Sequence, residues 1–200
     1  MKYDPNKHHR RSIRLKGYDY AQAGAYFVTI CTQNRECLFG EVVDDEMRLN
    51  EYGAIVREEW FRSAEIRQEI ELFPDEFVVM PNHVHGIAWI VGSNNVGATG
   101  RVGATGRSPL RQPSRPCGPN NRSLSSFIAG FKSATAKRIN AHRAAPGTPV
   151  WQRNYYEHIT RNEESLNRIR QYILDNPLRW VADRENPDAV EREPEEAWRV

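Results

Sequence analysis

Apolar residues along this chain follow two periods, one typical of strands and one typical of helices. Residues 26–32, YFVTICT, are rich in aromatic and β-branched side chains and predict a strand. Further apolar runs that predict strands lie at 70–72, 77–80, 83–91 and 150–159. In three other stretches the apolar residues recur every three or four positions, as on one face of a helix. These stretches follow Asn50, Ser123 and Asn162, whose side chains can accept hydrogen bonds from the free N–H groups of a helix N-terminus.

The order of these elements predicts the fold class. A short hairpin is expected between 38 and 49, and the run at 70–80 is one strand region interrupted by Pro74. The remaining order is strand, helix, strand, strand, helix, strand, helix. We therefore expect an α+β fold with a ferredoxin-like βαββαβ antiparallel sheet, helices on one face and an added C-terminal helix. With 200 residues, the chain is long enough for one core and short for two.

Charge and composition divide the chain into one domain, two appendages and one insertion. The domain spans 25–182, after a basic arm at 1–24. An acidic tail with few apolar residues follows at 183–200, and we expect it either to be disordered or to regulate access to a site. Within the domain, 92–122 contains VGATGR twice, is dense in Gly and Pro, and has five arginines and no acid. It predicts a flexible insertion.

Basic residues are the candidates for contact with nucleic-acid phosphates. The formal net charge is only +2, but a basic arm on a balanced domain gains phosphate contacts, although basic chain ends are often merely solvated. The second predicted helix has a basic outer edge. Such contacts carry no sequence information. The residues expected to bind in this way are Arg10, Arg11, Arg14, Lys16, Lys132, Lys137 and Arg138.

Several classes of protein are disfavoured. No apolar run reaches the roughly 18 residues that cross a bilayer, and none follows the basic start, so we expect a cytoplasmic protein without a membrane partner. The three cysteines are widely spaced and fit reduced thiols. The repeated glycines are not followed by lysine at P-loop spacing, so no nucleotide cofactor is expected.

Two histidines are the first candidates for chemistry. Alternate residues of a strand share a face, so His83 and His85 would present two imidazoles able to chelate one divalent ion. An isolated pair at this spacing is more often coincidental, and two ligands do not complete a site. On the third helix, however, Tyr172 and Asn176 are four residues apart and share a helical face, at the margin of its apolar stripe.

Five sequence blocks follow one another between about Arg10 and Trp180. They are RRSIRLKGYDY, AYFVTICTQNRECLFG, FVVMPNHVHGIAWI, SLSSFIAGFKSATAKRIN and WQRNYYEHITRNEESLNRIRQYILDNPLRW. In content and order they resemble the HUH-type single-strand transposases, and among these the REP-associated tyrosine transposases. The resemblance leaves out the glycine-rich insertion and the acidic tail.

The resemblance implies a reaction and a role for each candidate. In this family an H-x-H pair binds a divalent cation, a tyrosine on a following helix is the nucleophile, and Gln or Asn one turn later completes the metal site. The matching residues are His83, His85, Tyr172 and Asn176, and Asn176 is one methylene shorter than Gln. The third helix would then be the catalytic helix of an endonuclease and transposase. It would act on single-stranded or REP-type hairpin DNA through a 5′-phosphotyrosine, with Mg²⁺ or Mn²⁺, at the nucleoid, as a monomer or a homodimer.

Other residues and functions stay open. Tyr155 and Tyr156 are alternative nucleophiles, and His158 is a possible accessory ligand or proton donor, although a lone histidine is more often structural. Trp151, Tyr155 and Trp180 are candidates for stacking on bases, although aromatic residues in such contexts more often belong to the core. The alternative functions are a non-catalytic single-stranded nucleic-acid-binding module, a zinc hydrolase and a domesticated relative that no longer moves DNA.

Overall fold

The structure of this chain is a computed structural model that describes residues 18–91, 122–194 and 197–199. The expected arm before residue 18 and the insertion up to residue 121 lie outside the described residues, so both remain predictions. No helix within the described ranges combines the length and the apolarity needed to cross a membrane.

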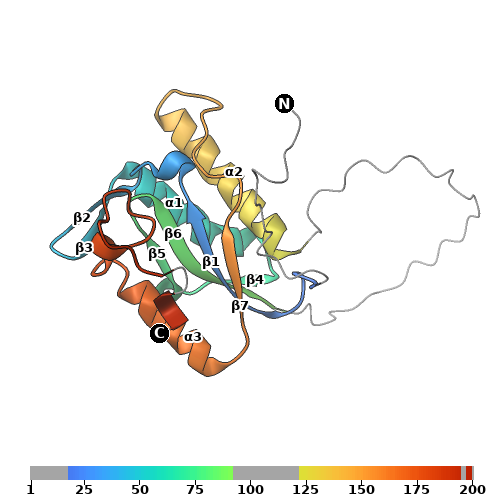
Figure 1. The fold of residues 1–200 in the computed structure, drawn as a ribbon. Coiled ribbons are helices and arrows are strands. Elements are labelled where there is room, and N and C mark those ends of the chain that lie inside the picture. Colours follow the sequence, from blue (N-terminus) through green and yellow to red (C-terminus); the bar gives the residue numbers. More distant parts are fainter. Residues whose placement is uncertain (1–17, 92–121, 195–196, 200) are drawn as a thin grey trace, which may run out of the picture.

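A five-stranded antiparallel sheet forms the centre of the fold (Figure 1). Its strands are β1 (Gly24–Cys31), β4 (Ile70–Glu71), β5 (Phe77–Val79), β6 (His83–Ile90) and β7 (Tyr156–Thr160). β1 lies between β6 and β7, while β4 and β5 pair with two stretches of the outer edge of β6. With β4 and β5 counted as one interrupted strand, the order is that of the expected βαββαβ layer. The α+β prediction is confirmed, and β2 (Gly40–Val43) and β3 (Glu46–Leu49) form the expected separate hairpin.

One expected strand is shorter than its sequence pattern. Residues 150–159 were expected to form one strand, yet β7 begins at Tyr156 and Trp151 makes only an isolated bridge with Thr32. The carbonyls of Gln152 and Asn154 instead accept hydrogen bonds from a lysine of the second helix. Backbone hydrogen bonds from Gln33 to Val150 and from Gln152 to Cys31 flank the bridge at Trp151, and the regular ladder resumes only at β7.

The helices are α1 (Glu51–Ile66), α2 (Leu124–His142) and α3 (Glu163–Leu174). Each begins directly after its predicted cap. Asn50 Oδ1 accepts from two backbone N–H groups of α1, Ser123 forms a capping box, and Asn162 Oδ1 accepts from the N–H of Ser165. These bonds satisfy donors that have no partner within the helix.

Helices α1 and α2 cover one face of the sheet and α3 covers the other (Figure 1). On the first face, Trp60 of α1 packs edge-on against Phe131 of α2, with ring centroids 5.2 Å apart. On the second, the apolar stripe of α3 packs against Phe27 of β1 and Ile87 of β6. Because side chains alternate along a strand, every second residue of β6, including His83, faces α3.

Candidate active site

Strand β6 places two buried imidazoles side by side on the face that α3 covers. His83 and His85 are 0% and 3% exposed, and their Nε2 atoms lie 3.0 Å apart. Their Nδ1 atoms lie 2.9 Å from Asn82 Oδ1 and Thr29 Oγ1 respectively. Burial lowers the pKa of His83, and burial together with the neighbouring His83 lowers the pKa of His85 further. Both rings are therefore neutral at neutral pH, the form that binds a metal ion.

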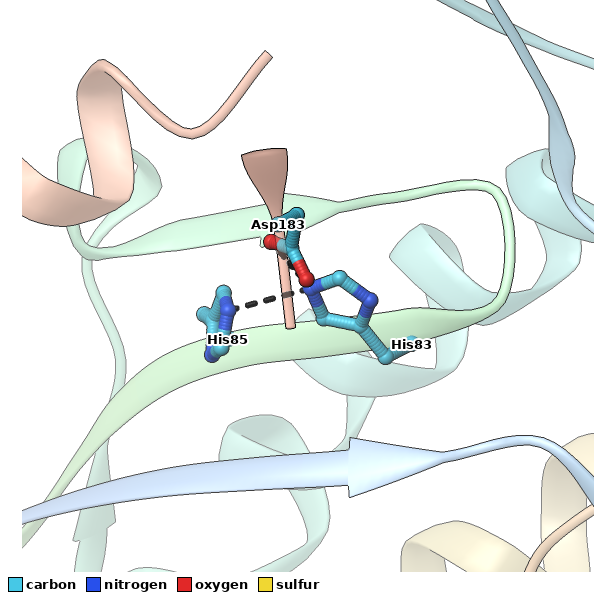
Figure 2. A group of neighbouring side chains, drawn as sticks. All are labelled: His83, His85 and Asp183. Carbon is cyan, nitrogen blue, oxygen red and sulfur yellow. Dashed lines mark hydrogen bonds and ion pairs between the residues drawn. The ribbon is translucent and has the colours of Figure 1, made fainter. Parts of the chain in front are cut away.

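An aspartate from the C-terminal segment joins the pair (Figure 2). Asp183 follows the short 3-10 helix Trp180–Ala182 and is 2% exposed. Its Oδ2 lies 3.7 Å from His83 Nε2. The ligand atoms of His83, His85 and Asp183 all lie within 4.8 Å of one another. The sequence reasoning missed Asp183, which it assigned to the acidic tail, because no local pattern distinguishes it from the other acids there.

The three side chains fit a divalent cation. Two neighbouring ligands of an octahedral ion, each about 2.1 Å from it, lie about 3 Å from each other. The Nε2 atoms of His83 and His85 have that separation. Asp183 Oδ2 is buried and accepts no hydrogen bond from the described residues. Burial of a charged carboxylate oxygen without a hydrogen-bond donor costs free energy unless a cation balances the charge. The three side chains therefore have the chemistry of a metal site.

Helix α3 brings Tyr172 next to His85. Its ring centroid lies 5.2 Å from that of His85 and 6.2 Å from that of Phe27. The guanidinium of Arg179 lies 5.3 Å from the centre of the ring. Burial raises the pKa of Tyr172 above its ordinary value, nearby carboxylates led by Asp183 add to the effect, and Arg179 opposes it. The phenol is therefore protonated at neutral pH.

Asn176 lies just beyond the end of α3. It is 0% exposed, and neither atom of its amide makes a hydrogen bond with the described residues. Against the larger effects of burial, the amide raises the pKa of His83 and lowers that of Tyr172, so it lies near both. An amide oxygen left without a donor in this place is a further oxygen ligand available to a cation.

A pocket next to His85 leads to these groups. Tyr172 and Asp183 line it, Tyr156 contributes from β7, and Trp198 contributes from the C-terminal 3-10 helix (Ala197–Arg199). The described part of the acidic segment after 183 therefore packs onto the candidate site. The pocket wall combines aromatic faces with a carboxylate and an imidazole.

The basic residues of α2 lie on the opposite side of the sheet from the histidine pair. Lys132 Nζ donates to two backbone carbonyls, each at 2.9 Å. Arg138 forms ion pairs with two glutamates of α1 at 2.7 and 2.8 Å, and Lys137 is exposed. The arm residues Arg10, Arg11, Arg14 and Lys16 lie outside the described part of the chain. DNA contact by these residues remains a prediction. The basic residues of α2 lie on the other side of the sheet and do not reach the pocket.

The alternative nucleophiles and accessory residues lie in different surroundings. Tyr156 lines the pocket, whereas Tyr155 reaches toward α2. The His158 ring packs against Trp198, with centroids 4.3 Å apart, and His158 does not join the histidine and aspartate group. Trp151 is buried and its Nε1 donates to a threonine of α2, so it presents no face to a base.

Comparisons with known proteins agree with this fold. No protein-family model matches the chain. An uncharacterized protein of Haemophilus influenzae is 39% identical over 182 residues, which cover 91% of this chain and 96% of the relative. A solved structure of the REP-associated tyrosine transposase bound to a REP hairpin matches 83% of this chain and 73% of that chain. Its TM-score is 0.51 at 17% identity, so the likeness concerns the fold. The chain therefore belongs to the family of the Haemophilus influenzae protein and has the fold of the REP-associated tyrosine transposase.

Proposed function

We propose that this protein is a metal-dependent endonuclease and strand transferase that cuts single-stranded DNA with Tyr172 as the nucleophile. The observation that carries the proposal is the meeting of three distant parts of the chain at one point. β6 supplies His83 and His85, the C-terminal segment supplies Asp183, and α3 supplies Tyr172, with its ring 5.2 Å from that of His85. A module that only binds nucleic acid has no use for this combination.

His83, His85 and Asp183 would hold Mg²⁺ or Mn²⁺, and Asn176 Oδ1 would add a further ligand. When bound, the cation would neutralise charge on the scissile phosphate and orient it. The two imidazoles favour Mn²⁺ over Mg²⁺, because Mg²⁺ prefers oxygen ligands. The other requirements, which are to position the phenol and to favour loss of its proton, must be met by residues of the protein.

Positioning of the phenol is the first of these requirements. Ile169 and Ile173 bury one side of α3 in the core. Arg170, two residues before Tyr172, donates through Nε and an NH2 group to Glu76 Oε1 at 2.8 and 2.6 Å. A nucleophile held on a rigid helix loses little freedom when it aligns with a phosphate. The Arg179 guanidinium over the Tyr172 ring favours the phenolate as the proton leaves.

The cleavage step balances without an external reactant. Tyr172 Oη forms a bond to phosphorus while the bond from phosphorus to the 3′ oxygen breaks. The phenol loses one proton and the departing 3′ oxygen takes one up, so no net proton is consumed. The products are a 5′-phosphotyrosine and a free 3′-OH. Because the new ester keeps the free energy of the old one, another 3′-OH can reverse the step and join strands.

We propose a REP-type hairpin with an unpaired flank as the substrate. The solved transposase with the same fold is bound to a REP hairpin. An unpaired strand can enter a pocket whose wall includes Tyr156 and Trp198, since aromatic faces accept any base. Work on chromosomal DNA would place the enzyme in the cytoplasm at the nucleoid.

A covalent adduct tests the proposal. Labelled hairpin DNA with single-stranded flanks, incubated with Mn²⁺, should give a protein–DNA adduct on a denaturing gel, and EDTA should abolish it. Tyr172→Phe should give none. Tyr156→Phe is the matched control, because it removes a hydroxyl from the same pocket and should keep the adduct. An adduct that survives Tyr172→Phe would refute the assignment, and tight binding without any adduct would favour a binding module.

A further inference from the structure

We infer that Asn82 is a positioning residue for the candidate metal site, because one side-chain amide sets the tautomer of His83 and holds the segment that carries Asp183. The inference rests on the proposed function in taking His83 and Asp183 as metal ligands. Asn82 directly precedes β6 and is 0% exposed. No feature of the sequence alone distinguished it from the residues around it.

The neighbours of Asn82 fix the orientation of its amide. One terminal atom lies 3.1 Å from the carbonyl oxygen of Arg35 and 2.7 Å from that of Glu185. Carbonyl oxygens only accept hydrogen bonds, so this atom is Nδ2 with its two N–H groups. The other atom, Oδ1, lies 2.9 Å from His83 Nδ1 and can only accept. His83 is therefore the Nδ1–H tautomer, and its Nε2 lone pair faces His85.

His85 differs because its partner can donate or accept. Thr29 Oγ1, a hydroxyl, lies 2.9 Å from His85 Nδ1. Without a cation, the 3.0 Å contact between the two Nε2 atoms needs one proton. His83 Nε2 has none, so His85 Nε2 carries it and Thr29 donates to Nδ1. With a cation both Nε2 lone pairs are needed, so His85 becomes the Nδ1–H tautomer and Thr29 accepts. His83 is thus preset for metal binding, while His85 must switch.

The same amide holds the C-terminal segment in place. Its Nδ2 donates to the carbonyl of Glu185, whose own N–H donates to Asp183 Oδ1 at 2.6 Å. The Glu185 carboxylate in turn pairs with Arg35 at 2.8 Å. Asn82 also donates to the Arg35 carbonyl, so these contacts form a closed set around Asp183. Removal of the whole Asn82 side chain would therefore free the segment that carries Asp183 and also remove the acceptor that fixes the tautomer of His83.

Histidine tautomers in the metal-free full-length protein give the first test. Long-range ¹H–¹⁵N correlation spectra in EDTA should report Nδ1–H for His83 in the wild type. Asn82→Ala should give a mixture or the Nε2–H form, whereas Asn82→Asp should keep the wild-type form, since its carboxylate also accepts from Nδ1. Wild-type His83 in the Nε2–H form, or an unchanged tautomer in Asn82→Ala, would overturn the inference.

Binding of Mn²⁺, followed by electron paramagnetic resonance, tests the link to Asp183. Asn82→Ala should weaken Mn²⁺ binding about 10- to 100-fold, the usual effect of losing a group that orients a metal ligand. Asp183→Asn should weaken binding in the wild type but add little in the Asn82→Ala or Asn82→Asp background, because the tether is already lost. An equal effect of Asp183→Asn in all backgrounds would refute the link. The Asn82→Asp variant keeps this test available if Asn82→Ala does not fold.

Asn140→Ala is the matched control. Asn140 is a buried asparagine of α2 whose Nδ2 donates to the carbonyl of Thr148 at 2.9 Å, away from the histidine pair. Its loss should leave Mn²⁺ affinity unchanged, and a comparable loss of affinity there would mean general destabilisation and would overturn the inference. Wild-type protein that binds no Mn²⁺ would refute the proposed metal site, whereas the tautomer of His83 is decided separately by the spectra in EDTA.

Discussion

Mild acid should destabilise the metal-free protein at a pH where most carboxylates are still charged. The cause is the buried pair of His83 and His85, which the fold keeps neutral. In the unfolded chain both imidazoles return to water and to the ordinary histidine pKa of about 6.5. Lowering the pH from 7 to 5 in EDTA therefore perturbs these two groups before the bulk of the carboxylates.

The sign and size of the effect follow from proton linkage. Both imidazoles have a lower pKa in the folded protein than in the unfolded chain. At a pH between the folded and the unfolded pKa, the unfolded chain therefore binds more protons than the folded protein. The contribution of the two histidines to the free energy of unfolding is therefore complete above pH 6.5. It is lost as the pH falls toward their folded pKa values. One histidine contributes about 1.4 kcal/mol per pH unit in that window. The pair gives an upper slope of about 2.7 kcal/mol per pH unit.

Urea unfolding at pH 7.0, 6.0, 5.5 and 5.0 measures this slope. His85→Asn should remove about half of it, because one neutral imidazole is gone. His142→Asn is the control: its side chain is 46% exposed and pairs with Glu51 at the surface, so its removal should leave the slope nearly unchanged. A flat profile below pH 6.5, or equal slopes in the wild type and His85→Asn, would refute the reasoning.

Three further perturbations test other parts of the structure. Mn²⁺ at 100 times its Kd should raise the free energy of unfolding by about 2.7 kcal/mol. Asp183→Asn should reduce that gain at the same Mn²⁺ concentration, and an equal gain in the variant would show that Asp183 is not a ligand. Gly86→Ala should destabilise by about 1–3 kcal/mol in urea, because the new Cβ would lie 2.7 Å from the tryptophan ring of α1, whereas Gly130→Ala, with its nearest neighbour at 3.5 Å, should not. Glu76→Ala should lower the free energy of unfolding in urea by about 1–3 kcal/mol, because the Arg170 guanidinium on α3 loses its buried partner. It should reduce the rate of adduct formation by a larger factor than the affinity for Mn²⁺, and an unchanged adduct rate would exclude a role of Glu76 in placing the helix.

Local patterns predicted the elements well because local forces build them. Asn50, Ser123 and Asn162 cap the three helices as expected, since a capping side chain bonds to backbone N–H groups two or three residues away. The strand periodicity likewise placed His83 and His85 on one face, because alternation is a property of the extended backbone itself. The strand expected from residue 150 is interrupted between the bridge at Trp151 and the start of β7, where the carbonyls of Gln152 and Asn154 accept from Lys132, a residue of another element that no local pattern indicates.

The grouping of His83 with His85 was readable from sequence because both residues sit on one regular strand. Tyr172 and Asn176 were expected to share a helical face, but α3 ends at Leu174, so Asn176 lies just beyond the helix that carries Tyr172. Which face of the sheet α3 would cover was not readable from sequence, since an apolar stripe states only that a helix is buried. Nor did any pattern join Asp183 and Asn82 to the histidines. Their places depend on contacts between segments far apart in the chain, such as the hydrogen bond from Asn82 to the Glu185 carbonyl. The sequence alone determined the fold class and the grouping of His83 with His85, whereas only the packing of the C-terminal segment onto β6 decided which carboxylate lies beside the histidines and which amide contacts both His83 and that segment.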